Sequence, residues 1–302
     1  MKVYTLDLSF LDIPQAIAAF LVEAGDTHIL IETGPYSTIR QLEGSLQALG
    51  KSAAKLDAVL VTHIHLDHAG AAWYFAQKGI PVYMHPIGAP HMADPSKLLQ
   101  SAQRIYGDQM ERLWGTLKPI PEACLHTVSH GEELHIGNCR IKAWHTPGHA
   151  IHHVAWQIED HLFTGDVAGV RIGGSLVVPP CPPPDIDVEA WDQSIEILRR
   201  QAPGQLLLTH FGAYTDVLPH LQELQERLHA WADWMRPHAE TGRPAQEIVP
   251  LFQDFVHSQL RAAGLNEQQI ARYEAANPSF MSVAGLLRYW KKKFEKQKTE
   301  NQ

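Results

Sequence analysis

Residues 58–70 read AVLVTHIHLDHAG, and this stretch decides the fold. Its first four residues are apolar and predict a short buried strand. His63 and His65 follow two residues apart, so an extended backbone points both imidazoles to the same side. In an extended backbone Asp67 would face the same side as the two histidines, and His68 would face the other side unless the chain turns. Such a turn would aim Asp67 and His68 at a second point near the first, which predicts one half of a two-metal site.

A structural role for these histidines is the alternative, because the chain has 19 histidines and some will be neighbours by chance. Residues 63–68, however, contain four side chains of the kinds that commonly bind metal. They directly follow an apolar run and precede the small residues Ala69-Gly70. This combination is much less expected by chance than two neighbouring histidines. Imidazole and carboxylate are also the usual ligands of zinc and related ions. The pattern therefore favours metal binding.

Three further short motifs follow in the chain. They are Thr146-Pro147-Gly148-His149, the step Gly165-Asp166 after Phe163-Thr164, and His210 after the apolar run Leu206-Leu207-Leu208. Together with residues 63–68, and in this order over residues 18–212, they resemble the motifs of the metallo-β-lactamase superfamily. The resemblance implies an α/β (α+β) fold, a four-layer αββα sandwich, here with a C-terminal helical extension.

The resemblance also implies how the ligands divide. The first metal ion would take His63, His65 and His149, the second would take Asp67, His68 and His210, and Asp166 would bridge them. Two divalent ions are expected, with zinc first and iron or manganese as alternatives. A hydroxide shared by the two ions would attack the substrate, and Asp67 would act as the catalytic residue that orients it.

The bridging Asp166 favours one branch of the superfamily. Antibiotic-degrading members generally lack this aspartate, so a true β-lactamase is not expected, whereas members of the glyoxalase II and lactonase type have it. The implied activity is metal-dependent hydrolysis of a small ester, thioester, lactone or phosphodiester. Two alternatives remain, a persulfide dioxygenase with a single iron ion and a non-catalytic binding protein on the same fold.

Four residues near the motifs have less certain roles. Arg171 could bind an anionic group of the substrate, or it could form a surface salt bridge. His153 could contact the substrate or support the ligands, or it could be purely structural. His145 precedes the Pro-Gly turn and is expected to be a neighbour of the site and not a ligand. Glu32 stands where the superfamily usually has an aspartate that supports the metal loop.

The rest of the chain predicts a catalytic domain over residues 1–215 and a helical extension over 216–302. Residues 87–118 predict broken helices that either form a wall of the substrate site or pack as core. The stretch 179–184 has five prolines in six positions, which excludes ladder pairing and predicts a stiff loop, either at the rim of the site or on the surface.

Bulk composition excludes some functions. The chain is 45% hydrophobic and 19% charged, and its net charge of −8 argues against a general nucleic-acid binder. Its start resembles no signal peptide, and no apolar stretch is long enough for a membrane span. Three cysteines without Cys-x-x-Cys spacing favour a reducing compartment, so the cytoplasm is the expected location. A small-molecule substrate is expected, and the helical extension could supply a homodimer contact.

Overall fold

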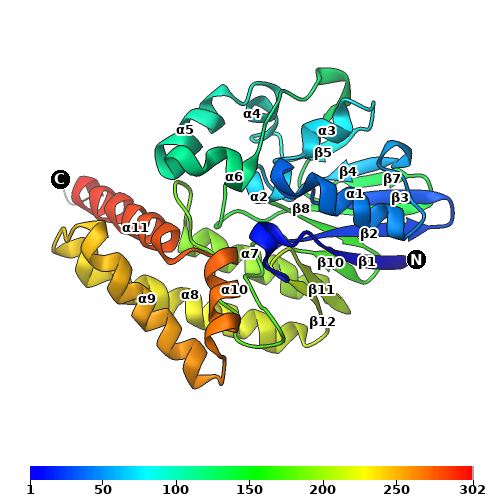
Figure 1. Ribbon diagram of the computed structural model, residues 1–302. Coiled ribbons are helices and arrows are strands. Elements are labelled where there is room, and N and C mark those ends of the chain that lie inside the picture. The colour runs from blue at the N-terminus through cyan, green and yellow to red at the C-terminus, as the bar shows by residue number, and fades with distance from the viewer. Residues whose placement is uncertain (301–302) are drawn as a thin grey trace.

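The computed structural model describes residues 1–300, in which two six-stranded sheets face each other (Figure 1). In the first sheet, β1 to β3 are antiparallel and β3 to β6 are parallel. Its strands lie side by side in chain order: β1 Lys2–Asp7, β2 Ala18–Ala24, β3 Thr27–Ile31, β4 Ala58–Leu60, β5 Val82–Met84 and β6 Leu125–Thr127.

The second sheet has the order β12-β11-β10-β9-β8-β7, and only its β10 and β11 run parallel. Its strands are β7 Glu133–Ile136, β8 Cys139–His145, β9 Val154–Ile158, β10 His161–Phe163, β11 Gln205–Leu208 and β12 Gly212–Tyr214. The short strand β12 was not expected from the sequence. Three of the motif loops begin at the carboxyl ends of the parallel strands β4, β10 and β11, and the loop with His149 begins after the antiparallel strand β8.

Three apolar layers separate the elements. Side chains of both sheets, among them Phe20 and Trp156, fill the layer between them. Helices α1 Ile39–Ala48 and α3 Ala72–Ala76 bury apolar side chains against the outer face of the first sheet, and α7 Val188–Gln201 covers the second. Two sheets between two helical layers confirm the predicted four-layer sandwich.

The loop after β4, residues 61–65, leads directly into a short helix. A short helix, α2 Leu66–Ala69, begins within the motif, and α3 starts separately after it. The backbone amides of His68 and Ala69 donate to the His65 carbonyl oxygen. This turn is the one that the spacing of Asp67 and His68 required.

The insertion after β5 consists of three helices, α4 Ala89–Ala93, α5 Ser96–Tyr106 and α6 Met110–Trp114. Gly107 ends α5 with a positive φ of 51°, a conformation that glycine adopts without steric cost. The insertion lies opposite the last helices of the chain in Figure 1.

The C-terminal part contains α8 Val217–Glu240, α9 Ala245–Ala262, α10 Glu267–Ala276 and α11 Ser279–Glu300. These helices share one apolar cluster with α7 and the outer face of the second sheet. They also hold the proline-rich loop, because the Asn277 side-chain amide donates to the Pro179 carbonyl oxygen and the Cys181 amide donates to the Ser282 hydroxyl. The helices therefore pack on the body of the protein. The division at residue 215 stays a prediction.

Within residues 1–300, none of the helices combines the length and the apolar character that crossing a membrane requires.

Gly285 tests the packing of α11 on the loop. A Cβ atom there would overlap the carbonyl oxygen of Cys181. We expect Gly285→Ala to lower the free energy of unfolding by about 1–3 kcal/mol, because a helix and a backbone segment must move apart. Urea denaturation measures the change.

Gly44 in α1 is the matched control, because a Cβ atom there meets nothing within 4 Å. Gly44→Ala should raise stability by about 0.5–1 kcal/mol through helix propensity. A stabilising Gly285→Ala would show that α11 does not pack closely on the loop.

Candidate metal centre

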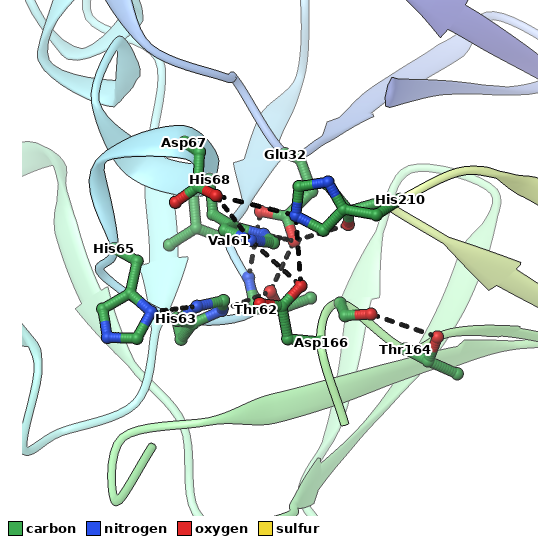
Figure 2. A network of polar contacts seen from close by, with 12 residues as sticks. Glu32, Val61, Thr62, His63, His65, Asp67, His68, Thr164, Asp166 and His210 are labelled. Atoms are coloured by element: carbon green, nitrogen blue, oxygen red, sulfur yellow. Dashed lines mark hydrogen bonds and ion pairs between the residues drawn. The ribbon is translucent and has the colours of Figure 1, made fainter. Parts of the chain in front are cut away.

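The motif segments converge at the carboxyl ends of β3, β4, β10 and β11 (Figure 2). The loop after β4 carries His63 and His65, and α2 carries Asp67 and His68. The loops after β8, β10 and β11 add His149, Asp166 and His210. Seven side chains from distant parts of the sequence thus meet at one edge of the sandwich.

Two glycines allow this convergence. Gly148 precedes His149 with a φ of 128°, and a Cβ atom there would collide with the backbone of Trp191 in α7. Gly165 precedes Asp166 with a φ of 49°, and a Cβ atom there would collide with the Thr62 side chain. In both motifs the glycine lets the ligand loop approach a neighbouring element more closely than any side chain permits.

The first group contains His63, His65 and His149. His63 Nε2 lies 2.8 Å from His65 Nδ1, and His149 Nε2 lies 3.2 Å and 3.1 Å from these two atoms. Two nitrogens bound tetrahedrally to one zinc ion at about 2.0–2.1 Å would be about 3.3 Å apart. The three nitrogens are therefore close enough to share one ion.

The second group contains Asp67, His68 and His210, whose candidate ligand atoms all lie within 4.8 Å of one another. Asp67 Oδ2 is 3.7 Å from His68 Nε2 and 3.6 Å from His210 Nε2. Burial alone would raise the pKa of Asp67, but the charge on His68 and the contact with His210 lower it to about 2.

Asp166 lies between the two groups. Its Oδ2 is 3.3 Å from His149 Nε2 in the first group. Its Oδ1 is 3.2 Å from His68 Nε2 and 3.3 Å from His210 Nε2 in the second. One carboxylate oxygen therefore faces each group, which is the arrangement that a bridging ligand requires.

The hydrogen bonds behind the histidines fix which ring nitrogen carries the proton. His149 Nδ1 is 2.8 Å from the Pro180 carbonyl oxygen, and His210 Nδ1 is 2.6 Å from that of Ala16. A carbonyl oxygen only accepts hydrogen bonds, so Nδ1–H donates in both residues and Nε2 presents a lone pair.

The same argument applies to His63 and His68. His68 Nδ1 is 3.0 Å from Glu32 Oε1, and an ionised carboxylate only accepts. The Thr62 hydroxyl donates to Glu32, so its oxygen is left to accept from His63 Nδ1 at 3.0 Å. The Nε2 atoms of His63, His68, His149 and His210 therefore point at one buried region.

Two of these nitrogens and one oxygen of Asp166 have no hydrogen-bond partner in the part of the protein that the structure describes. His68 Nε2, His210 Nε2 and Asp166 Oδ1 are buried without a hydrogen bond of acceptable geometry. Burial lowers the pKa of His63 far below its usual range and that of His65 to about 3, which keeps these rings neutral. Burial would also lower the pKa of His68 and of His210, but the neighbouring Asp166 and Asp67 raise both values, so without a cation these two rings hold a proton beside the carboxylates. A cation in each group would take the place of that positive charge. Buried groups of this kind are normally paired, so the residues present fit two divalent cations.

Glu32 links the metal loop to its surroundings. Its side chain is fully buried, and it accepts hydrogen bonds from the Thr62 hydroxyl and, at 3.3 Å each, from the Thr62 amide and the Thr209 hydroxyl. With His68, these contacts join the ends of β3, β4 and β11. The longer side chain of glutamate therefore still makes hydrogen bonds to the metal loop.

The two predicted substrate contacts, Arg171 and His153, do not line the cavity beside the metal groups. Arg171 lines no part of the cavity at the site, and its Nη1 pairs with Asp216 at 2.8 Å while its guanidinium stacks on Tyr214. These contacts are those of the salt bridge that we weighed against a substrate role. His153 is fully buried, stacks behind His63 and makes its contact with Thr146.

His152 lines the cavity in place of His153, with a buried Nδ1 that has no partner. The sequence shows two adjacent histidines but not which of them faces the substrate, because that depends on the turn of the loop. His145 also lies outside the metal groups: its Nε2 is 2.9 Å from the Val128 carbonyl oxygen, and its ring packs on His85.

Comparison with known proteins identifies the family. The profile of the metallo-beta-lactamase superfamily matches residues 13–210, so the chain belongs to this superfamily. A metallo-beta-lactamase fold-containing protein of Sulfurisphaera tokodaii is 30% identical over 204 residues, which cover 65% of this chain and 74% of that protein. Members of the superfamily are metal-dependent hydrolases, and the histidine and aspartate groups accordingly suggest divalent metal ions.

Other relatives cover different parts of the chain. An atrochrysone carboxyl ACP thioesterase of Aspergillus chevalieri is 29% identical over 215 residues, which cover 70% of this chain but only 57% of the thioesterase. A metallo-beta-lactamase family protein of Thermus thermophilus, at 19% identity, has the same fold with a TM-score of 0.69 over 97% of this chain and 94% of its own. That match includes the C-terminal helices.

Glu32 provides a test of how the ligands are supported. In Glu32→Gln an amide nitrogen would face the Thr62 amide or hydroxyl, and the negative charge beside His68 would be lost. We expect metal affinity to fall about 10- to 100-fold, the usual cost of losing a hydrogen-bond partner behind a ligand. Competition with a chelating dye measures it.

Glu23→Gln is the control, because Glu23 pairs with Lys51 on the other end of the sheet and should leave metal affinity unchanged. An unchanged affinity in Glu32→Gln would mean that Glu32 does not orient His68.

His149 and His145 test the ligand assignment directly. His149→Ala removes a nitrogen of the first group, so we expect the purified protein to lose metal. His145→Ala removes a ring that contacts only Val128, His130 and His85 among its described partners, so metal content should stay the same. Elemental analysis of both proteins distinguishes the two residues, and the reverse result would reassign the ligand.

Proposed function

We propose that the protein is a dinuclear metal-dependent hydrolase of the glyoxalase II and lactonase-like branch. Its substrate would be a small ester, thioester, lactone or phosphodiester. The observation that carries this proposal is the position of Asp166, with one oxygen toward each group of ligand atoms. Two divalent ions in these groups would lower the pKa of a bound water and polarise the carbonyl or phosphoryl oxygen of the substrate.

The seven predicted ligands have distinct tasks in this proposal. His63, His65 and His149 would hold one ion, and Asp67, His68 and His210 would hold the other, with Asp166 between them. Zinc suits this set, and iron or manganese would also be accepted. The hydrogen bonds from Nδ1 of His149 and His210 to backbone carbonyls keep Nε2 of both rings available and correctly aimed.

Asp67 is the proposed catalytic residue. It is the only carboxylate of the second group, and it lines the cavity together with His65 and Asp166. Its side chain is 22% exposed, whereas that of His68 is fully buried. A carboxylate at this position can accept a hydrogen bond from the attacking water and orient it toward a substrate in the cavity.

The second group of ligands argues for two ions over one. A dioxygenase with a single iron ion would use only one group and would leave Asp67, His68 and His210 without an ion. A non-catalytic binding protein has no need of either group, and all seven side chains are present and converge. Both alternatives therefore account for less of the structure.

The thiols support the proposed location. Cys124, Cys139 and Cys181 are all free, and burial raises the pKa of Cys181 well above its usual range. A protein that leaves every cysteine unpaired is typical of a reducing compartment, so we propose the cytoplasm.

Asp166→Ala tests the proposed mechanism. The side chain contacts only ligand atoms, so we expect the protein to remain folded, to lose at least one of its two metal equivalents and to lose turnover. Circular dichroism, elemental analysis and turnover assays measure these three outcomes. The assays follow hydrolysis of a thioester, a lactone, an activated phosphodiester and a β-lactam, and oxygen uptake with glutathione persulfide. The β-lactam and the persulfide should not react.

Asp185→Ala is the control, since Asp185 lines the same cavity but belongs to neither metal group. It should keep both metal equivalents. Full activity in Asp166→Ala, or a single tightly bound iron with oxygen uptake on the persulfide, would overturn the proposal.

A further inference from the structure

A cavity of about 780 Å³ opens onto the metal centre. His65, Asp67 and Asp166 line it at one end. Its other walls come from the insertion α5–α6, the proline-rich loop and the last helices α10–α11. In Figure 1, α11 lies directly below α5 and α6. A water molecule takes up about 30 Å³ in the liquid, so the cavity is many times larger than a two-carbon acyl group needs.

The walls are strongly apolar. The insertion contributes Leu98, Ala102 and Ile105, and the C-terminal helices contribute Ala276 and Met281. Four large apolar side chains that line the cavity are nevertheless exposed: Ile87 at 46%, Ile105 at 42%, Ile151 at 48% and Phe280 at 40%. Such a concentration of exposed apolar surface around one cavity indicates that the ligand itself is apolar.

The charged residues of the cavity lining also favour an apolar substrate. Lys97 is the only lysine or arginine among the lining residues of the described chain, and it is exposed. The acidic side chains are Asp67, Asp166, Asp185 and Glu274. A phosphodiester or a peptide with several carboxylates would need more cations than this wall offers.

We infer that the substrate is a carboxylic ester, thioester or lactone whose acyl part is a long apolar chain. The chain fills the cavity, and its carbonyl lies at the end formed by His65, Asp67 and Asp166. This inference rests on the proposed hydrolase function and narrows its substrate class.

In this reaction, water adds across the bond between the acyl carbon and the leaving sulfur or oxygen. The water oxygen bonds to the acyl carbon, and the bond from that carbon to the leaving sulfur or oxygen breaks. The two protons of water end on the carboxylic acid and on the released thiol or alcohol. No oxidant or second substrate is needed.

The insertion and the C-terminal helices act together in this inference. The Tyr106 hydroxyl at the end of α5 lies 3.8 Å from the Met281 sulfur at the start of α11. The proline-rich loop, which forms a third wall, is held to the same helices by hydrogen bonds from Arg288 and Lys292 to the Pro184 carbonyl oxygen. Elements outside the sheets therefore determine which acyl chain fits.

A series of acyl chains tests this inference on the metal-loaded protein. Acetyl, hexanoyl and decanoyl thioesters of N-acetylcysteamine share one small, neutral leaving group, and p-nitrophenyl esters of the same acids repeat the series. We expect kcat/KM to rise at least about 100-fold from acetyl to decanoyl, well below the ceiling of about four-fold per buried methylene. A flat or falling series would overturn the inference.

Two variants test whether the preference for long acyl chains depends on the cavity. Ile105→Ser places a hydroxyl on the exposed apolar lining, and Leu251→Ser is its control, because Leu251 in α9 is 39% exposed but does not line the cavity. Ile105→Ser should reduce the decanoyl-to-acetyl ratio about ten-fold or more, whereas Leu251→Ser should leave it unchanged. Equal effects in both variants would place the acyl chain elsewhere.

A binding measurement separates this inference from the proposed function. Titration of decanoate and acetate into the Asp166→Ala protein by calorimetry requires no turnover. Decanoate binding to this variant, together with no hydrolysis of any ester by the unaltered, metal-loaded protein, would uphold the cavity and reject the hydrolase. Ester hydrolysis that prefers acetyl groups, with no decanoate binding, would uphold the hydrolase and reject the apolar substrate.

Discussion

The structure depends on one constraint. Nitrogen and oxygen atoms of histidine and aspartate side chains converge in a buried region where the protein offers few hydrogen-bond partners. Backbone carbonyls, Thr62 and Glu32 take the Nδ1 protons of four histidines and leave four Nε2 atoms facing Asp166. Burial of unpaired polar atoms costs free energy, and a cation in each group would satisfy His68 Nε2, His210 Nε2 and Asp166 Oδ1. The strand ends, the two glycines and the buried glutamate are all explained by this requirement.

Sequence patterns indicated which side chains gather at the candidate metal centre but not which ones face the substrate, for a physical reason. Spacing fixes direction along one strand or turn, so His63, His65, Asp67 and His68 could be grouped from the order of residues alone. Arg171 follows a site residue closely in sequence, but its partner Asp216 lies after β12, a strand that no pattern indicated. Local spacing carries no information about such distant partners.

Sequence patterns also could not predict which residues line the cavity. Its walls come from three segments, and each carries apolar residues that pattern alone cannot distinguish from ordinary core. In the insertion, Met92 is core whereas Leu98 and Ile105 line the cavity, although all three are apolar residues of short helices. The proline-rich loop was expected either at the rim or on the surface, and Pro180 both lines the cavity and accepts from His149.

This position of Pro180 has a consequence for how the protein is made. The loop that orients His149 is itself fastened by Asn277 and Ser282, which the ribosome adds long after the histidine. During synthesis, the earlier ligands can fold while the ring of His149 still lacks its fixed acceptor. The contacts that complete the support of His149 therefore require the chain through Ser282 of α11.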